Sequence, residues 1–210
     1  MNNTLRIFLI VVALVVVMLL SCAAFVAGIY NGLVTASQAV DASWAQVQNV
    51  YQRRADLVPN LVQTVAGSAN FEKSTMVEVA EARASVGKVQ VDAHQAPTDP
   101  AQLASFQQAQ GQLGSALSRL LVVSEQYPDL KSNASFRDLQ AQLEGTENRI
   151  SVERERFNTA VQYYNVKVRT FPVVLFAGMM GYAPKPYFTA TPQAATAPAV
   201  QFDFKDLQKN

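Results

Sequence analysis

The charged residues that could do chemistry in this chain are concentrated in two segments. One segment, "SWAQVQNVYQRRADLVPNLV" at 43–62, places Arg53 and Arg54 among apolar residues, and the other, at 143–156, is rich in glutamate and arginine. Arg54 falls on the apolar seam of its segment, where steps of three and four residues are typical of a packed helix. A charge on such a seam is expected either to form a buried ion pair or to belong to an active site.

An active site would have to be built from carboxylates. Glu144, Glu147 and Glu153 lie on one predicted helix, but a glycosidase-like pair requires two carboxylates positioned in a cleft. A di-metal carboxylate bundle requires a Glu-x-x-His motif on each of two helices, and His94 is the single histidine of the chain. We therefore expect no enzyme, no metal and no cofactor, and a carboxylate site in the bundle is the remote alternative.

The simpler hypothesis is a structural polar network around Arg54. An isolated buried guanidinium is strongly destabilising, so Arg54 is expected to have a partner. If its helix neighbours the later Glu-rich helix, then Arg54, together with Arg53, would pair with Glu147 or Glu153. Such a network fixes the register of the helices more than it adds stability.

The overall composition excludes several kinds of partner. The net charge of the chain is +1, and without Arg6 its basic and acidic residues balance. The body therefore has no basic surface of the kind that binds nucleic acid. No Gly-rich phosphate loop, HExxH or GxSxG motif is present, so we expect no small-molecule substrate.

The N-terminal region predicts a membrane anchor. Residues 7–29, "IFLIVVALVVVMLLSCAAFVAGI", form a run of 23 residues without a charge. As a helix this run would be about 34 Å long, enough to cross a bilayer core. We predict a single transmembrane helix over 7–29 after a short tail at 1–6. Arg6 precedes the run and no Lys or Arg occurs at 30–49, which favours a body on the extracytoplasmic side.

The only cysteine, Cys22, raises an alternative kind of anchor. "LLSC" at 19–22 resembles the lipobox of bacterial lipoproteins, in which the cysteine is lipidated. The apolar run continues for seven residues beyond Cys22, and lipidation does not require this. An uncleaved helix is therefore favoured over lipid attachment at Cys22.

The body of the chain is predicted to be all-α, an antiparallel four-helix bundle of long helices preceded by one transmembrane helix. Apolar seams in steps of three and four predict helices over 33–65, from 71 onward, over 101–126 and over 134–170. Pro59 predicts a kink or a break in the first of these. The bundle domain is placed at 30–188, and an Ala/Thr/Pro-rich tail at 189–210 is predicted to be disordered, with "FDFKDL" at 202–207 as a weak docking motif.

The apolar C-terminal segment of the bundle, residues 173–188, has two interpretations. Up-down-up-down topology would return the fourth helix to the membrane, so "VVLFAGMMGYAPKPYF" would contact the lipid interface. In the other interpretation the segment folds back and caps the bundle core.

Several of these stretches resemble the LemA family. They are "YNGLV" at 30–34, "VDASWAQVQNVYQRRADLVPNLVQTV" at 40–65, "LSRLLVVSEQYPDLKSN" at 117–133, "LEGTENRISVERERFNTAVQYYN" at 143–165 and "RTFP" at 169–172. The resemblance implies a membrane-anchored bacterial protein with an antiparallel helical bundle and no established enzymatic activity, cofactor or catalytic residue. One relative is linked to magnetosome membrane formation. Some members carry a lipoprotein-like cysteine just before the "YN" motif, whereas Cys22 stands eight residues before Tyr30.

Two functions follow as hypotheses for a single-pass protein of the bacterial cell membrane. The first is a non-enzymatic scaffold or adaptor that binds an unknown protein partner or a second copy of itself. The alternative is a membrane-shaping protein that acts on lipid through its anchor and residues 173–188.

Overall fold

The structure of the chain is a computed structural model that describes residues 3–67, 71–89, 91–92 and 95–189. His94 and the segment at 202–207 lie outside the described residues. Within them, every regular element is a helix, which confirms the all-α prediction: α1 (Asn3–Ala66), α2 (Lys73–Lys88), α3 (Pro100–Ser124), α4 (Pro128–Ser132), α5 (Ala134–Arg169) and α6 (Val174–Ala177).

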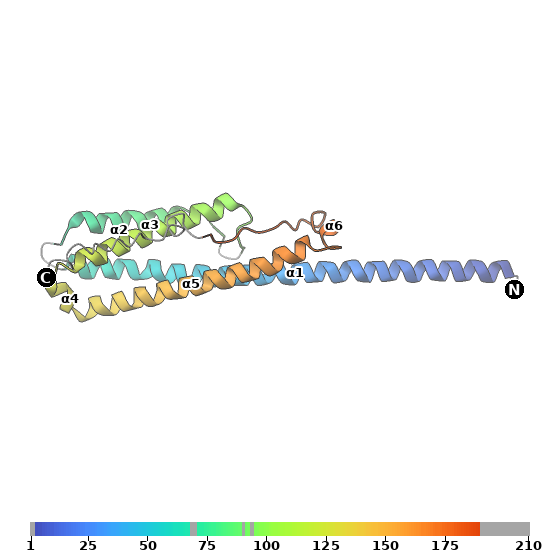
Figure 1. Cartoon of the computed structure of the whole chain (residues 1–210), viewed down its shortest axis with the longest axis horizontal. Coiled ribbons are helices and arrows are strands. Elements are labelled where there is room, and N and C mark those ends of the chain that lie inside the picture. The colour runs from blue at the N-terminus through green and yellow to red at the C-terminus, as the bar shows by residue number, and fades with distance from the viewer. Residues whose placement is uncertain (1–2, 68–70, 90, 93–94, 190–210) are drawn as a thin grey trace, which may run out of the picture.

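The predicted anchor and the first bundle helix are one continuous helix. α1 has 64 residues, which corresponds to about 96 Å of helix, and Figure 1 shows it extending far beyond the other elements. It continues through Pro59 without a break. Proline removes one helical hydrogen bond, but Val58 and Leu61 on either side of it are fully packed in the core.

The two ends of α1 have different surroundings. Every described side chain from 5 to 25 is exposed, whereas Leu33, Val40 and Trp44 are completely buried. The exposed end includes a helical stretch long and apolar enough to cross a membrane. Because none of that stretch is buried against the rest of the chain, it is not a core helix of the bundle.

The long helices pack antiparallel. α5 lies along the bundle part of α1, and α2 and α3 form a second pair that lies over them (Figure 1). α5 runs back toward the apolar end of α1, so the chain after it returns to that end. We call the end of the bundle nearest the apolar part of α1 the proximal half, and the opposite end the distal half.

The core consists of two apolar clusters. The proximal cluster is aromatic and includes Trp44, Phe106 and Phe157. The distal cluster is mainly aliphatic, and α2 contributes to it. Its buried side chains include Leu61, Val79, Leu113, Leu120 and Leu143.

The segment before α5 contains one more helical turn than the sequence predicted. The helices predicted over 101–126 and 134–170 left "YPDLKSN" at 127–133 between them, and five of its residues form α4. Asn133 then begins α5, because its Oδ1 accepts hydrogen bonds from the backbone of Ser135 and Phe136 at 2.9 and 3.3 Å. These bonds make Asn133 the N-cap of α5.

The C-terminal segment divides into two parts. Residues 171–181, which we call the apolar turn, contain α6 and lie at the proximal end (Figure 1). Residues 182–189, which we call the strap, are not helical and run back along α5. The strap caps the core, whereas the apolar turn leaves large apolar side chains exposed.

Candidate functional site

A polar layer centred on Arg54 separates the two apolar clusters. Arg54 is only 4% exposed. Its Nη1 donates to Glu147 Oε2 at 2.9 Å, and its Nη2 donates to the side-chain Oε1 and backbone O of Gln110 at 2.6 and 3.0 Å. Gly114 lies beside the guanidinium, and a Cβ there would make an ordinary van der Waals contact with Nη1 at 3.7 Å. The layer therefore ties together α1, α3 and α5.

A groove of about 660 Å³ lies beside this layer. Its lining comes from α1, α3 and α5 and includes Arg54, Gln107, Gly111, Leu143 and Thr189. Two of the donors in these residues, Arg54 Nε and Gln107 Nε2, are buried and have no hydrogen-bond partner within the described part of the chain. Buried donors are normally satisfied, so the groove is suited to an occupant that offers hydrogen-bond acceptors.

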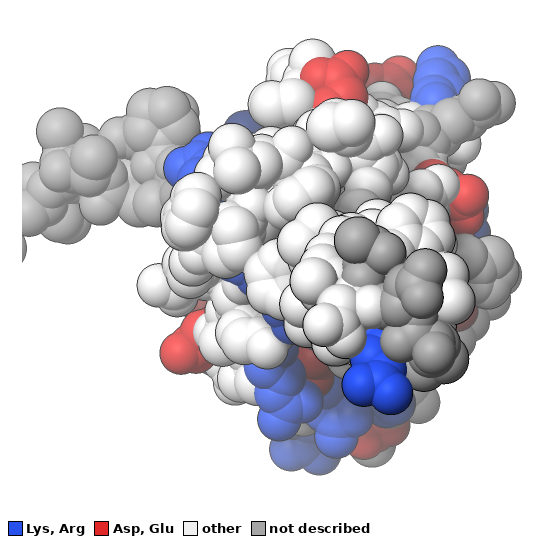
Figure 2. Space-filling model, turned by 90° about the vertical axis from the view of Figure 1, so that its right-hand side faces the viewer, with Lys and Arg blue, Asp and Glu red and all other residues white. Residues whose placement is uncertain are grey.

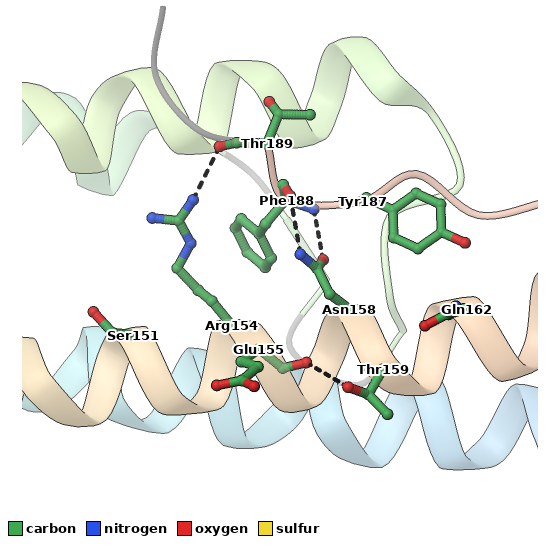
Figure 3. Close-up of a pocket in the computed structure, with 9 residues that line it drawn as sticks. All are labelled: Ser151, Arg154, Glu155, Asn158, Thr159, Gln162, Tyr187, Phe188 and Thr189. Atoms are coloured by element: carbon green, nitrogen blue, oxygen red, sulfur yellow. Dashed lines mark hydrogen bonds between the residues drawn. The ribbon is translucent and has the colours of Figure 1, made fainter. Parts of the chain in front are cut away.

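The strap is held to α5 by two asparagine side chains. Asn165 donates to the carbonyl of Lys185 and accepts from its N–H, both at 2.8 Å. Asn158 makes the same pair of bonds with Phe188 at 3.0 and 2.9 Å, as Figure 3 shows. An asparagine side chain presents one donor and one acceptor, so each replaces the strand partner that an extended backbone would otherwise need.

Two strap side chains also enter the bundle. Lys185 Nζ lies 2.8 Å from Asp41 Oδ1 in an ion pair that is almost fully buried. The ring of Phe188 stacks on Trp44 with centroids 6.1 Å apart and meets Phe157 edge-on at 5.3 Å. The last described strap residue, Thr189, accepts a hydrogen bond from Arg154 at 3.2 Å (Figure 3).

The apolar turn leaves large side chains uncovered. Phe171 is 75% exposed, Leu175 59% and Met179 87%. In contrast, Met180 packs toward α1 and lines an apolar groove of about 600 Å³ with residues 19–30. The turn therefore lies beside the second half of the predicted span at 7–29.

Basic residues adjoin the apolar turn. Between 163 and 184 the sequence has Lys167 and Arg169 and no acidic residue, and both lie in the last turn of α5. Figure 2 faces this end of the molecule and shows a broad uncharged surface with Lys and Arg gathered on one flank. Apolar side chains with neighbouring cations are typical of a surface that meets a bilayer interface.

Tyr51 lies at the edge of the polar layer and lines the same groove. Burial raises the pKa of the Tyr51 hydroxyl above 10.0, although the guanidiniums of Arg154 and Arg54 oppose this shift. The guanidinium of Arg54 also lies over the Tyr51 ring, 5.1 Å from its centroid. Tyr51 is thus a neutral hydrogen-bonding group at neutral pH.

Comparison with known protein families shows which family the chain belongs to. The LemA family model matches residues 43–202, which include all of the polar layer and the strap. The chain belongs to the LemA family. The resemblance stated from the sequence motifs is confirmed.

Curated relatives agree with this assignment. The LemA-family chain described above is 28% identical over 209 residues to Magnetosome protein MamQ 2 of Paramagnetospirillum magneticum, covering 88% of this chain and 74% of that protein. It is 27% identical to Magnetosome protein MamQ of Magnetospirillum gryphiswaldense, over 85% of this chain and 71% of the relative. It is 26% identical to Protein LemA of Metamycoplasma hominis, over 60% of this chain and 52% of the relative.

In the structure of this LemA-family protein, only two of the four residues predicted for the polar network contact each other. Arg54 and Glu147 are brought together. Arg53 is exposed and does not join them, because the next position along a helix lies on a different face. Glu153 is also not in the network, since it pairs with Arg156 at 2.7 Å on the same helix.

Other residues of this site were not found by sequence reasoning. Gln110 is a polar residue on the apolar seam of its helix, and it accepts two of the three hydrogen bonds from Arg54. Asn158, Asn165 and Asp41 were not singled out, because helix patterns do not show which residues meet a non-helical segment. The spacing of Asn158 and Asn165, seven residues apart on one helix face, was the available signal.

Cys22 is an exposed free cysteine in the apolar part of α1. It lines the same apolar groove as Met180. Lipid attachment at Cys22 stays a prediction.

Proposed function

We propose that this LemA-family protein is a non-enzymatic scaffold, anchored in the bacterial cell membrane by α1, that presents its bundle to a protein partner or to a second copy of itself. The observation that carries the proposal is the continuity of α1. One helix of 64 residues contains both the exposed apolar stretch and the buried seam of the bundle. A continuous helix has no flexible linker, so the bundle is held at a fixed height above the membrane.

The arrangement of charges supports a structural role for the bundle. Glu147 is bound to Arg54, and Glu144 accepts a hydrogen bond from Gln140 at 3.1 Å on the surface of α5. Lys185 and Asp41 are bound to each other. Glu147 and Asp41 are therefore engaged in contacts between elements, and Glu144 in a contact within α5.

The orientation follows from the sequence around the span. Arg6 precedes the apolar stretch, and the following residues to Asn49 carry no Lys or Arg. By the positive-inside rule the N-terminus is cytoplasmic and the bundle lies on the extracytoplasmic side. Two relatives are named as magnetosome proteins, which supports a function at a membrane.

Membrane shaping is the second candidate function, and the apolar turn favours it. Met180 contacts the groove formed by residues 19–30. From Leu19 to Ile29 the helix covers about 15 Å, half of a bilayer core of about 30 Å. If α1 spans the bilayer, the turn enters one leaflet beside it, and a wedge in one leaflet would favour curvature.

The scaffold is tested by photo-crosslinking of the full-length protein in its native membrane. A photoreactive residue is placed at Val77, Val122 or Val152, which are large apolar side chains exposed on three different helices. Gln126, an exposed polar position, serves as the control. A discrete adduct to another protein or to a second copy from one of the valine positions supports the scaffold. Adducts equal to those of the control at all three positions would contradict it.

Membrane shaping is tested with liposomes that contain the reconstituted protein. Replacement of Phe171, Leu175 and Met179 by serine leaves the core intact, because all three are exposed. Tubulation or vesiculation that this variant loses supports the second function. Equal deformation by both proteins, or none by either, counts against it.

A further inference from the structure

The strap ends at the edge of the groove beside Arg54. Thr189 is its last described residue, and Thr189 is itself part of the groove lining. Figure 3 shows the strap passing Asn158 and then Arg154, with Ser151 further along α5 in the same direction. The sequence continues for 21 more residues.

The strap follows α5 in a regular register. Lys185 is bonded to Asn165 and Phe188 to Asn158, so three strap residues correspond to seven helical residues. Three extended residues cover about 10 Å and seven helical residues about 10.5 Å, and the two lengths match. Continued at the same rate, Thr191 would face Ser151 and Ala194 would face Glu144.

The groove offers hydrogen-bond donors to the carbonyl groups of an extended backbone. Arg54 Nε and Gln107 Nε2 are buried donors without a partner among the described residues, and backbone carbonyls are acceptors. Gly111 has no atom within 4 Å of where a Cβ would lie, so the α3 wall of the groove is open. The residues that would point inward, Thr191 and Ala194, are small, which lets a backbone approach closely.

We propose that the groove between α3 and α5 is a docking site for the segment of this chain that follows Thr189, at 190–196. The segment continues the strap and gives backbone carbonyls to Arg54 and Gln107. Pro192 favours an extended backbone. The family match extends to residue 202, beyond the end of the described strap. The proposal does not depend on the scaffold function.

Proximity is measured by cross-linking in the full-length protein with Cys22→Ser. If the segment docks at the rate of the strap register, Gln193 would be level with Glu147 and therefore near Gly111. The pair Gly111→Cys and Gln193→Cys is treated with a short bismaleimide. The control pair is Gly87→Cys and Gln193→Cys, because Gly87 on α2 also lies in open space but does not line the groove.

Docking predicts on the order of tenfold more intramolecular cross-link for the Gly111 pair than for the Gly87 pair, because a docked segment raises the effective concentration at one site only. Equal yields would show that the segment is not in the groove. Cross-linked dimers in place of monomers would assign the groove to a second copy. Either result overturns the proposal.

The solvent accessibility of the groove at position 111 gives a second measurement, and it does not require a thiol in the segment after Thr189. In a chain that ends at Thr189, maleimide labelling of Gly111→Cys should be about tenfold faster if the groove is covered nine-tenths of the time. Labelling of Gly87→Cys on α2, also in open space, should not change. An unchanged rate at position 111 would overturn the proposal.

The role of the unpartnered donor is tested separately. Gln107→Leu should lower the docking equilibrium constant about fivefold, which is the effect of losing one hydrogen bond. A segment docked about nine-tenths of the time would then be docked about two-thirds of the time, and the initial rate of the Gly111–Gln193 cross-link should fall in proportion. Gln108→Leu, an exposed neighbour that does not line the groove, is the matched control. Equal initial rates for the two variants would overturn the proposed bond to Gln107.

Discussion

The two halves of the bundle cover their apolar cores with different kinds of segment. In the distal half, α1, α2, α3 and α5 surround an aliphatic core. In the proximal half, α2 has ended at Lys88, and the core is completed by the loop after α2 and by Phe188 of the strap. A helix satisfies its own backbone, whereas an extended segment does not. The proximal half therefore needs Asn158 and Asn165, and the distal half needs no counterpart.

The same difference appears in the size of the core side chains. One large ring, Trp44, contacts Phe106, Phe157 and Phe188 from three different elements. The distal half distributes its packing over many leucines and valines. The stability of the proximal half should consequently depend on a few residues. The distal half should lose less stability when a single residue is substituted.

The largest expected effect tests that dependence. Trp44→Ala should lower the free energy of unfolding by about 4 kcal/mol, because it removes a fully buried ring and leaves a cavity. Leu120→Ala, also fully buried, should cost about 3 kcal/mol. Urea unfolding of the full-length protein in detergent micelles measures both. If Leu120→Ala were the more damaging of the two, the proposed contrast between the halves would be wrong.

The second effect concerns the layer between the halves. Gln110→Leu should cost about 2–3 kcal/mol, because it removes a side-chain acceptor from the buried Arg54 guanidinium. Glu147→Gln should cost less than about 1 kcal/mol, because the Glu147 side chain is 59% exposed and water replaces much of the pair. The same urea titrations compare the two. Equal costs would show that the exposed ion pair with Glu147 stabilises Arg54 as much as the buried acceptor of Gln110 does.

The sequence predicted the distal half well and the proximal half poorly, for a physical reason. Periodicity of apolar residues reports helix faces, and it gave the long helices and the seam that carries Arg54. Arg54 pairs with Glu147, one of the two expected carboxylates, because the antiparallel topology placed α1 beside α5. Arg53 and Glu153 did not join them, since adjacency in sequence does not give a shared helix face.

The strap was harder to predict because it has no periodic signal of its own. Its partners Asn158 and Asn165 are polar residues within an otherwise regular helix, and Asp41 lies on α1 far from Lys185 in sequence. Non-local pairing of an extended segment with side chains leaves little pattern, here only the seven-residue spacing of Asn158 and Asn165. The sequence therefore left open whether residues 173–188 cap the core, and the contacts of Lys185 and Phe188 answer this for the strap alone.

The third effect is local to the strap. Asn165→Ala should weaken the attachment of Lys185 by about 2 kcal/mol, because it leaves a buried N–H and carbonyl unpaired. Asn158→Ala should have a smaller effect of about 1 kcal/mol, since its bonds are only partly buried. Hydrogen exchange at the backbone amides of Lys185 and Phe188 measures the free energy of detaching the strap at each of these residues. Unchanged exchange at Lys185 in Asn165→Ala would show that the Asp41 ion pair alone holds the strap.

The smallest effect is a dependence on alkaline pH at the boundary between the halves. Burial raises the pKa of Tyr51 above 10.0 in the folded protein, so the folded state holds this proton more tightly than the unfolded chain. Its contribution to stability is complete below pH 10 and is lost as the pH rises through the folded pKa. Tyr51→Phe should therefore lose less stability than the wild type between pH 8 and pH 11, roughly the range that brackets tyrosine titration. The control is Tyr163→Phe, which changes an exposed ring and should follow the wild type. A wild-type-like pH profile for Tyr51→Phe would mean that Tyr51 ionises as readily in the fold as in the unfolded chain, and the boundary between the two halves would then be wetter than its burial indicates.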